Sequence, residues 1–228
     1  DPEAFARNLA RVVEEAGRAA SAYLKPREEG KASFDFADGL GEVVKTLTKV
    51  AEYWLIDPER AVEAERRLWG GYINLWATSL KRMMGEPAAP VASPDPRDRR
   101  FADPQWSENQ FFDFLKQIYL VTSRWAADMV DEASDVDPHT RQKAAFYVKQ
   151  IANALAPSNF VLTNPELLRE TFSSNAENLV RGLHMLAEDI KAGGGDLKIR
   201  QSGDGDFELG RNLAASPGKV IFQNEICQ

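Results

Sequence analysis

Hydrophobic residues recur at helical spacing along most of the chain, and the spacing changes only near its end. Apolar side chains three and four positions apart predict helices at 3–24, 38–55 and 58–84, and in three stretches after residue 107. Short apolar or alternating runs around GDGD predict a hairpin and a third strand. These predicted strands lie at 197–200, 207–209 and 219–223. The predicted fold class is mainly α, with short β-strands at the C-terminal end.

Helix ends are marked by short local signals. An Asp or Asn followed by Pro stands before three predicted helices, where the side chain can cap the first turn and Pro suits the first helical position. These pairs are Asp57-Pro58, Asp137-Pro138 and Asn164-Pro165. Gly85 and the glycines at 193–195 suit helix ends. The helix that stops at 193–195 is expected to be the longest, with an apolar line from Leu168 to Ile190.

The stretch from 98 to 120 carries the most explicit local pattern. Ser107 and Gln110 have the spacing of a capping box, and Trp106 and Phe111 stand where a hydrophobic staple would place them. The helix behind this cap is strongly apolar, so we expect it to be buried against others. Its predicted inner residues are Phe111, Leu115, Ile118, Trp125 and Met129.

Two stretches with proline and few apolar residues divide the chain. Residues 25–33 are expected to be a break, and residues 85–98, rich in Pro, Ala and Ser, are expected to be a linker. The predicted organisation is a helical segment, a Pro/Ala-rich linker, a denser helical domain and a β-containing tail. Their bounds are 1–84, 85–98, 99–195 and 196–228.

Composition narrows the class of protein. A formal net charge of -7 without a basic block argues against nucleic acid as a partner. The single Cys agrees with a reducing compartment, and no window approaches the length of a membrane span. The N-terminus lacks the unbroken apolar core of a signal peptide. We therefore expect a cytoplasmic protein with no transmembrane segment.

Four segments in the second half of the chain carry sequence motifs of one enzyme family. They read D-R-R-F-A-D-P-Q-W-x-x-N at 98–109, A-P-S-N-F-V-L-T-N-P-E at 156–166, R-G-L-H-M-L-A-E-D-I at 181–190 and F-E-L-G-R-N-L-A-A-S-P-G-K-V-I-F-Q-N-E at 207–225. In these pieces the chain resembles the N-terminal region of the class I polyhydroxyalkanoate synthases, bacterial polymerases that make polyester. Residues 1–94 carry the likeness much less distinctly.

The resemblance implies a parent acyltransferase that polymerises 3-hydroxyacyl groups from coenzyme A thioesters. It implies a Cys nucleophile in G-x-C-x-G, with a later Asp and His, in an α/β-hydrolase-like domain that would begin with the strands after residue 196. Cys227 stands in N-E-I-C-Q, without flanking glycines or a following His, and is expected to be an ordinary apolar residue. We predict no catalytic, cofactor-binding or metal-binding residue, no cofactor, and no catalysis by this chain alone.

Other candidate site residues favour structural roles. His139 is expected at the surface, and His184 packed or partly exposed beside an apolar line. Lys116 and Arg124 are expected to be solvated. The run 204–206 lacks the rest of a calcium loop, and the glycines at 193–195 lack the Lys-Ser/Thr of a phosphate loop.

The resemblance also implies what such a region does. It implies dimerisation, attachment to the polyester granule and its phasin coat, and stabilisation of the catalytic domain. The helix at 3–24 either lays Phe5, Leu9, Val12 and Tyr23 on a polymer surface or partner helix, or packs on the helices at 38–84, which we favour. Two alternatives remain open: a stand-alone truncated homologue that acts as an interaction protein, and an unrelated helical structural domain.

Overall fold

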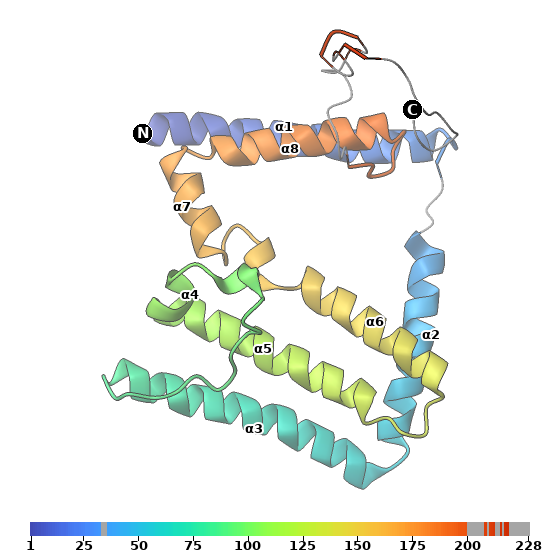
Figure 1. Cartoon of the computed structure of the whole chain (residues 1–228), viewed down its shortest axis with the longest axis vertical. Coiled ribbons are helices and arrows are strands. Elements are labelled where there is room, and N and C mark those ends of the chain that lie inside the picture. Colours follow the sequence, from blue (N-terminus) through green and yellow to red (C-terminus); the bar gives the residue numbers. More distant parts are fainter. Residues whose placement is uncertain (33–35, 200–207, 209, 213–214, 216, 219–228) are drawn as a thin grey trace. The chain divides into compact units, whose positions relative to one another are not determined.

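The computed structural model describes residues 1–32, 36–199, 208, 210–212, 215 and 217–218. Within these residues the fold is mainly helical, as predicted (Figure 1). The α-helices are α1 (Pro2–Glu28), α2 (Phe36–Leu55), α3 (Pro58–Met83), α4 (Gln105–Glu108), α5 (Gln110–Asp131), α6 (Pro138–Ala154), α7 (Pro165–Ser173) and α8 (Glu177–Ala192). Two 3-10 turns, η1 (Arg99–Phe101) and η2 (Pro157–Asn159), complete the elements of the described residues.

The predicted helix-end signals are confirmed where α3, α6 and α7 begin. Asp57 accepts hydrogen bonds from the amides of Glu59 and Arg60, Asp137 from one amide of the first turn, and Asn164 from two. Gly85, with φ +82°, ends α3 as predicted. Its amide and that of the next residue donate to two carbonyls of the last turn, the pattern of a Schellman motif.

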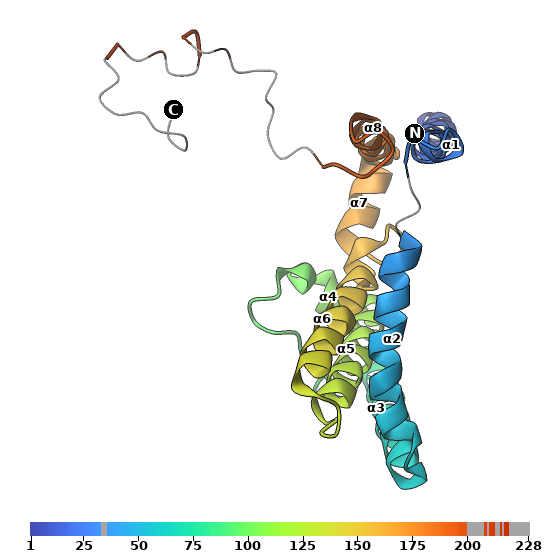
Figure 2. The ribbon, with the colours of Figure 1, turned by 90° about the vertical axis from the view of Figure 1, so that its right-hand side faces the viewer.

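The chain forms two compact units. The first comprises residues 1–14 and 33–182, and the second residues 15–32 and 183–228. In the first unit α5 packs between α3 and α6, and α2 packs against α3 and α6 (Figures 1 and 2). One core cluster of this unit joins Val50 of α2 to Val130 of α5 and Ala144 of α6. A second cluster joins Trp106 and Leu120 to residues that precede α5. The helices before and after residues 85–98 therefore pack together, while the predicted four-part division stays a prediction.

The predicted capping box before α5 is wrong. Residues 105–108 form the short helix α4, and Asn109 caps α5 by accepting from the amides of Phe111 and Phe112. Asn is as good a cap as Ser, and here it stands closer to the apolar run. The predicted staple also fails, because buried Trp106 packs edge-to-face on Phe112 while Phe111 is 58% exposed.

In the second unit the last part of α1 packs against α8. Ala19 on α1 and Ala187 and Ile190 on α8 form its buried cluster, and both views place these two helical segments side by side (Figures 1 and 2). The predicted break at residue 25 comes too early, since α1 continues to Glu28 through Pro26. Arg27 stabilises this last turn: it donates to the Gly195 carbonyl and to Asp196, each at 2.8 Å.

The predicted long helix between Pro165 and the triple glycine is two helices. Asn175 and Ala176 have φ of 51° and 66°, a left-handed conformation that ends α7 before α8 begins. The Asn175 carbonyl then accepts from Asn8 at 2.9 Å, while Phe5 stacks on Phe172 with ring centroids 5.8 Å apart. The apolar side of α1 thus packs on α7 and α8, which corrects the predicted partner at 38–84.

The predicted β-strands are not seen in the described residues. Residues 197–199 and 208 carry no strand. The other residues of these predicted strands, the run 204–206 and Cys227 lie outside the described part of the chain.

Candidate functional site

The helix α3 has apolar residues on two opposite sides. Its inner side faces α5: Ala64 and Leu75 are buried, and Trp125 of α5 donates to the Ala64 carbonyl at 2.9 Å. Gly71 lies on this side, where a Cβ would meet Val121 at 2.8 Å, so the close approach of the two helices requires glycine.

The outer side of α3 carries a second apolar line, which we call the α3 stripe. From Trp69 onwards its members are spaced by alternate steps of four and three, the spacing of a coiled-coil seam. Each is more than half exposed. The stripe consists of Val62, Trp69, Ile73, Trp76, Leu80 and Met83. A helix that is apolar on both sides is normally covered on both sides.

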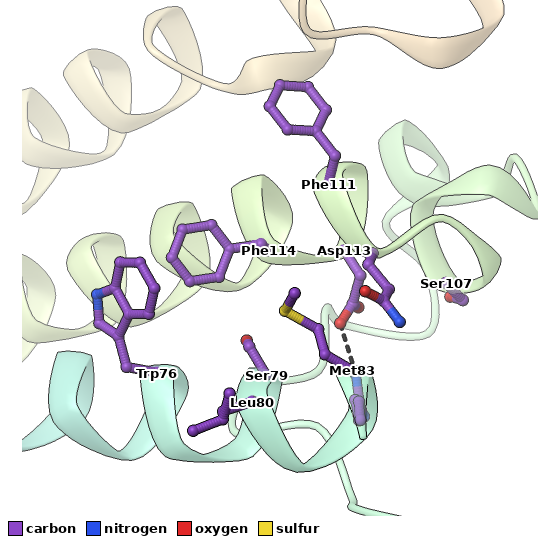
Figure 3. A pocket seen from close by; sticks show the side chains of 10 residues that line it. Trp76, Ser79, Leu80, Met83, Ser107, Phe111, Asp113 and Phe114 are labelled. Carbon is purple, nitrogen blue, oxygen red and sulfur yellow. Dashed lines mark hydrogen bonds and ion pairs between the residues drawn. The ribbon is translucent and has the colours of Figure 1, made fainter. Parts of the chain in front are cut away.

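A groove of about 350 Å³ lies between the C-terminal half of the stripe and the start of α5. In Figure 3 Trp76, Leu80 and Met83 rise from α3, and Phe114 comes from α5 toward them. Trp76 and Phe114 meet at an angle, with ring centroids 5.2 Å apart. The groove therefore continues the stripe onto a second helix and presents mainly hydrocarbon and aromatic surface.

A buried ion cluster closes one end of this groove. Asp113 lies 2.5 Å from Arg82 and 3.0 Å from Lys116, measured between charged atoms, and Asp113 and Lys116 have side chains only 12% and 7% exposed. Lys116 also donates to the Trp106 carbonyl at 2.5 Å, and Arg82 to the Ala88 carbonyl at 2.9 Å. The predicted solvation of Lys116 is thus wrong. Because every charge here has a partner within the chain, the cluster fixes α3, α5 and the loops around them.

Three of the four charged residues of the DRRFADPQW motif form ion pairs within the protein. Arg100 pairs with Asp98 at 2.8 Å, and Arg169 of α7 pairs with Asp103 at 2.5 Å. The hydrogen bond from Arg100 lowers the pKa of Asp98, and that from Arg169 lowers the pKa of Asp103. Asp98 in turn raises the pKa of Arg100. Asp98, Arg100 and Asp103 of the motif therefore hold the segment before α5 in place through contacts within the chain.

The other candidate residues lie apart from the groove. His139 is exposed, as predicted, and His184 is 55% exposed with Nδ1 3.2 Å from a carboxylate oxygen of Glu15. Arg124 is exposed but donates to the Ser93 carbonyl. The glycines at 193–195 follow the end of α8, as predicted. Across the described ranges no group of three or more metal-binding side chains comes together.

The α3 stripe is the feature that sequence reasoning missed. The apolar spacing over 58–84 predicts a helix but does not by itself separate buried Leu75 from exposed Trp76. The signal is present in the alternate spacing of Trp69, Ile73, Trp76 and Leu80. No helix in the part of the chain described is both long and apolar enough to span a bilayer.

Comparison with known proteins identifies the sequence. The profile of the family described as "Poly-beta-hydroxybutyrate polymerase (PhaC) N-terminus" matches residues 97–228. The chain is 52% identical over 228 residues to the poly(3-hydroxyalkanoate) polymerase subunit PhaC of Rhizobium meliloti (strain 1021), a match that covers 100% of this chain and 37% of the relative. No solved structure matches.

Two further relatives show the range of similarity. The poly(3-hydroxyalkanoate) polymerase of Methylorubrum extorquens is 45% identical over 235 residues, covering 100% of this chain and 39% of the relative. The polymerase subunit of Cupriavidus necator is 34% identical over 173 residues, covering 76% of this chain and 28% of the relative. The chain thus spans little more than a third of the length of the relatives that match all of it.

Proposed function

Because the chain belongs to the family of poly-beta-hydroxybutyrate polymerase N-terminal regions, we propose that it serves as the non-catalytic N-terminal region of a polyhydroxyalkanoate synthase. The complete enzyme would make polyester from 3-hydroxyacyl-coenzyme A. This region would support dimerisation of the synthase, its association with polyester granules or phasins, and the stability of the catalytic domain.

The observation that carries the assembly role is the exposed apolar surface formed by the α3 stripe and the adjoining groove. Contiguous apolar surface of this kind marks protein or membrane-like interaction sites on soluble domains. The relative in Rhizobium meliloti is described as a polymerase subunit, which suits a protein that works in an assembly. The helix α1 is a weaker candidate for this role, since Phe5 and Tyr23 of its apolar side already pack on α7 and α8.

A chimera tests the proposed function. The matching region of the Rhizobium meliloti polymerase would be replaced by residues 1–228, and coenzyme A release from 3-hydroxybutyryl-coenzyme A would be measured beside granule formation in cells. We expect the chimera to keep most of the relative's activity, deletion of the region to lower it at least about tenfold, and the isolated chain to release no coenzyme A. A chimera no more active than the deletion would contradict the proposal.

A further inference from the structure

We propose that Arg27, in the last turn of α1, is a positioning residue that sets the course of the chain after α8. In a complete synthase of the kind proposed above, the catalytic part continues from this point. The inference therefore rests on the proposed function, and it names the residue through which the N-terminal region orients the catalytic part.

The turn after α8 is closed, although three successive glycines would also suit a flexible linker. A Cβ at Gly193 would collide with the Asp196 carbonyl oxygen, so the turn folds back on itself too closely for any other residue. Gly194 and Gly195 have φ of +67° and +108°, and their amides donate to carbonyls of the last turn of α8. The glycines therefore build one defined turn, which fixes the direction in which the chain continues.

Arg27 joins this turn to the end of α1. Its Nη1 donates to the Gly195 carbonyl and its Nη2 to the Asp196 carboxylate, each at 2.8 Å. The same Nη1 donates to the Tyr23 carbonyl at 2.8 Å, and the guanidinium lies over the Tyr23 ring, 3.7 Å from its centroid. Because the planar guanidinium is rigid and contacts the helix end and the turn at once, it holds the two at a fixed distance.

The burial of Arg27 favours the closed position of the turn. Its side chain is only 5% exposed, whereas that of Asp196 is 73% exposed. Exposed ion pairs contribute little, but a buried charge is costly to leave without acceptors. Pro26 covers the turn from the side, since a Cβ at Gly195 would meet its ring at 3.0 Å. Opening the turn would remove two acceptors from a buried guanidinium.

The place of this contact in the sequence gives it a role in the enzyme. Under the proposed function, the rest of the polypeptide continues from residue 196. A segment that is held at its first residues leaves the part that follows a narrower set of orientations than a free glycine linker does. Loss of Arg27 should therefore change the orientation of the catalytic part and leave its folding intact.

Amide hydrogen exchange in the 228-residue chain tests whether Arg27 holds the turn. Arg27→Met keeps the apolar stem of the side chain, and it should lower the protection of the Gly194 and Gly195 amides at least about tenfold, because the turn loses its hydrogen bonds to a charged group. Arg7→Met, at an exposed position of the same helix, should leave this protection unchanged. Unchanged protection in Arg27→Met would overturn the inference.

Asp196→Ala tests the contact from the side of the turn. This change should lower the protection of the same two amides about threefold in the wild-type chain, because it removes one acceptor of Arg27. It should have no further effect in Arg27→Met, since the carboxylate acts through the guanidinium. An equal effect of Asp196→Ala in both backgrounds would count against the inference.

The chimera described above tests the consequence for the enzyme. With Arg27→Met, its kcat for coenzyme A release should fall at least about fivefold, because catalysis depends on orientation. Its Tm should stay within about 2 °C, whereas a merely stabilising contact would lower Tm and leave the kcat of the folded enzyme unchanged. Arg7→Met is again the control, and it should match the unmodified chimera in both measurements.

Two results would separate the inference from the proposed function. A chimera whose kcat is unaffected by Arg27→Met would overturn the positioning role and leave the proposed function standing. An unmodified chimera no more active than the deletion would contradict the proposed function, and the inference with it.

Discussion

Two neighbouring regions of the first unit depart from the usual distribution of side chains in opposite ways. The region 85–131 buries polar groups: Lys116 is 5% exposed and Gln117 is 1% exposed. The α3 stripe exposes apolar groups, with Ile73 and Trp76 both at 67%. Buried polar and exposed apolar groups are the informative exceptions in a folded chain. The first set forms ion pairs and hydrogen bonds within the chain, whereas the second set stays more than half exposed although Trp76 contacts Phe114.

The family profile begins at residue 97, after the α3 stripe ends. The profile therefore matches the part of the chain whose ion pairs and helix caps lie around α5. The exposed α3 stripe lies before that part. The residues by which the family is recognised and those of the proposed interaction surface are therefore different.

The largest effect on stability is expected from Asp113→Ala. This change leaves Lys116 buried without its carboxylate and Arg82 without its partner, which should lower the free energy of unfolding by about 3–5 kcal/mol. Urea denaturation followed by circular dichroism measures it. Asp131→Ala, at the exposed end of the same helix, should change stability by less than about 0.5 kcal/mol. A loss below 1 kcal/mol for Asp113→Ala would mean that the buried cluster does not hold the two helices together.

Gln117→Ala should have the next largest effect, about 2 kcal/mol. The Gln117 side-chain oxygen accepts from the buried Ala92 amide at 2.8 Å, and this bond ties residues 85–98 to α5. Removing it strands a buried N–H and leaves a small cavity. Exposed Gln142→Ala on α6 serves as the control in the same denaturation series. Equal stabilities of the two variants would show that residues 85–98 are not fixed to α5 by this bond.

Asp98→Asn should cost about 1 kcal/mol near neutral pH, because it removes the charge that pairs with Arg100. The pKa of Asp98 is lowered in the folded protein, so its contribution is complete above the unfolded pKa of about 3.9 and is lost as the pH falls through the folded pKa. Stability curves of the wild type and the variant should therefore converge on the acid side. Curves that run parallel down to the lowest pH would contradict this assignment.

The smallest effect is expected from Ile73→Ala in dilute protein. Ile73 is exposed, so its truncation should change the free energy of unfolding by less than about 0.5 kcal/mol. Leu75→Ala, two residues further along the same helix but 2% exposed, should cost about 2–5 kcal/mol. Equal losses at both positions would remove the distinction between the two sides of α3.

The sequence predicts well the features that depend on neighbouring residues. The starts of α3, α6 and α7 follow from Asx-Pro pairs, and the end of α3 follows from Gly85. Features that depend on distant partners were not predictable in the same way. Lys116 is buried in a cluster in which Arg82, 31 residues before Asp113, also pairs with that carboxylate, and solvation is otherwise the normal state of lysine.

Two other features, the break at Asn175 and the outer apolar line of α3, have a signal in the sequence, but each lies within a continuous helical periodicity. The left-handed Asn175 interrupts a continuous apolar periodicity, although Asn is among the residues that tolerate this conformation. In α3 the inner and outer apolar lines share one helix, so the same helical spacing fits both of them. The exposed fraction of each side chain distinguishes the two lines, and this fraction is known only from the folded structure.

The contacts of α1 with α7 and α8 also have a consequence for the order of events on the ribosome. Phe5 and Asn8 meet residues near 172–175, so about 165 residues must be added before these partners exist. At synthesis rates of about 5–20 residues per second, this takes roughly 8–33 s. During that time α2, α3, α5 and α6 can already assemble, while the apolar side of α1 stays exposed to solvent. Although α1 is the first of the described helices to be synthesised, it is among the last to pack against its partners.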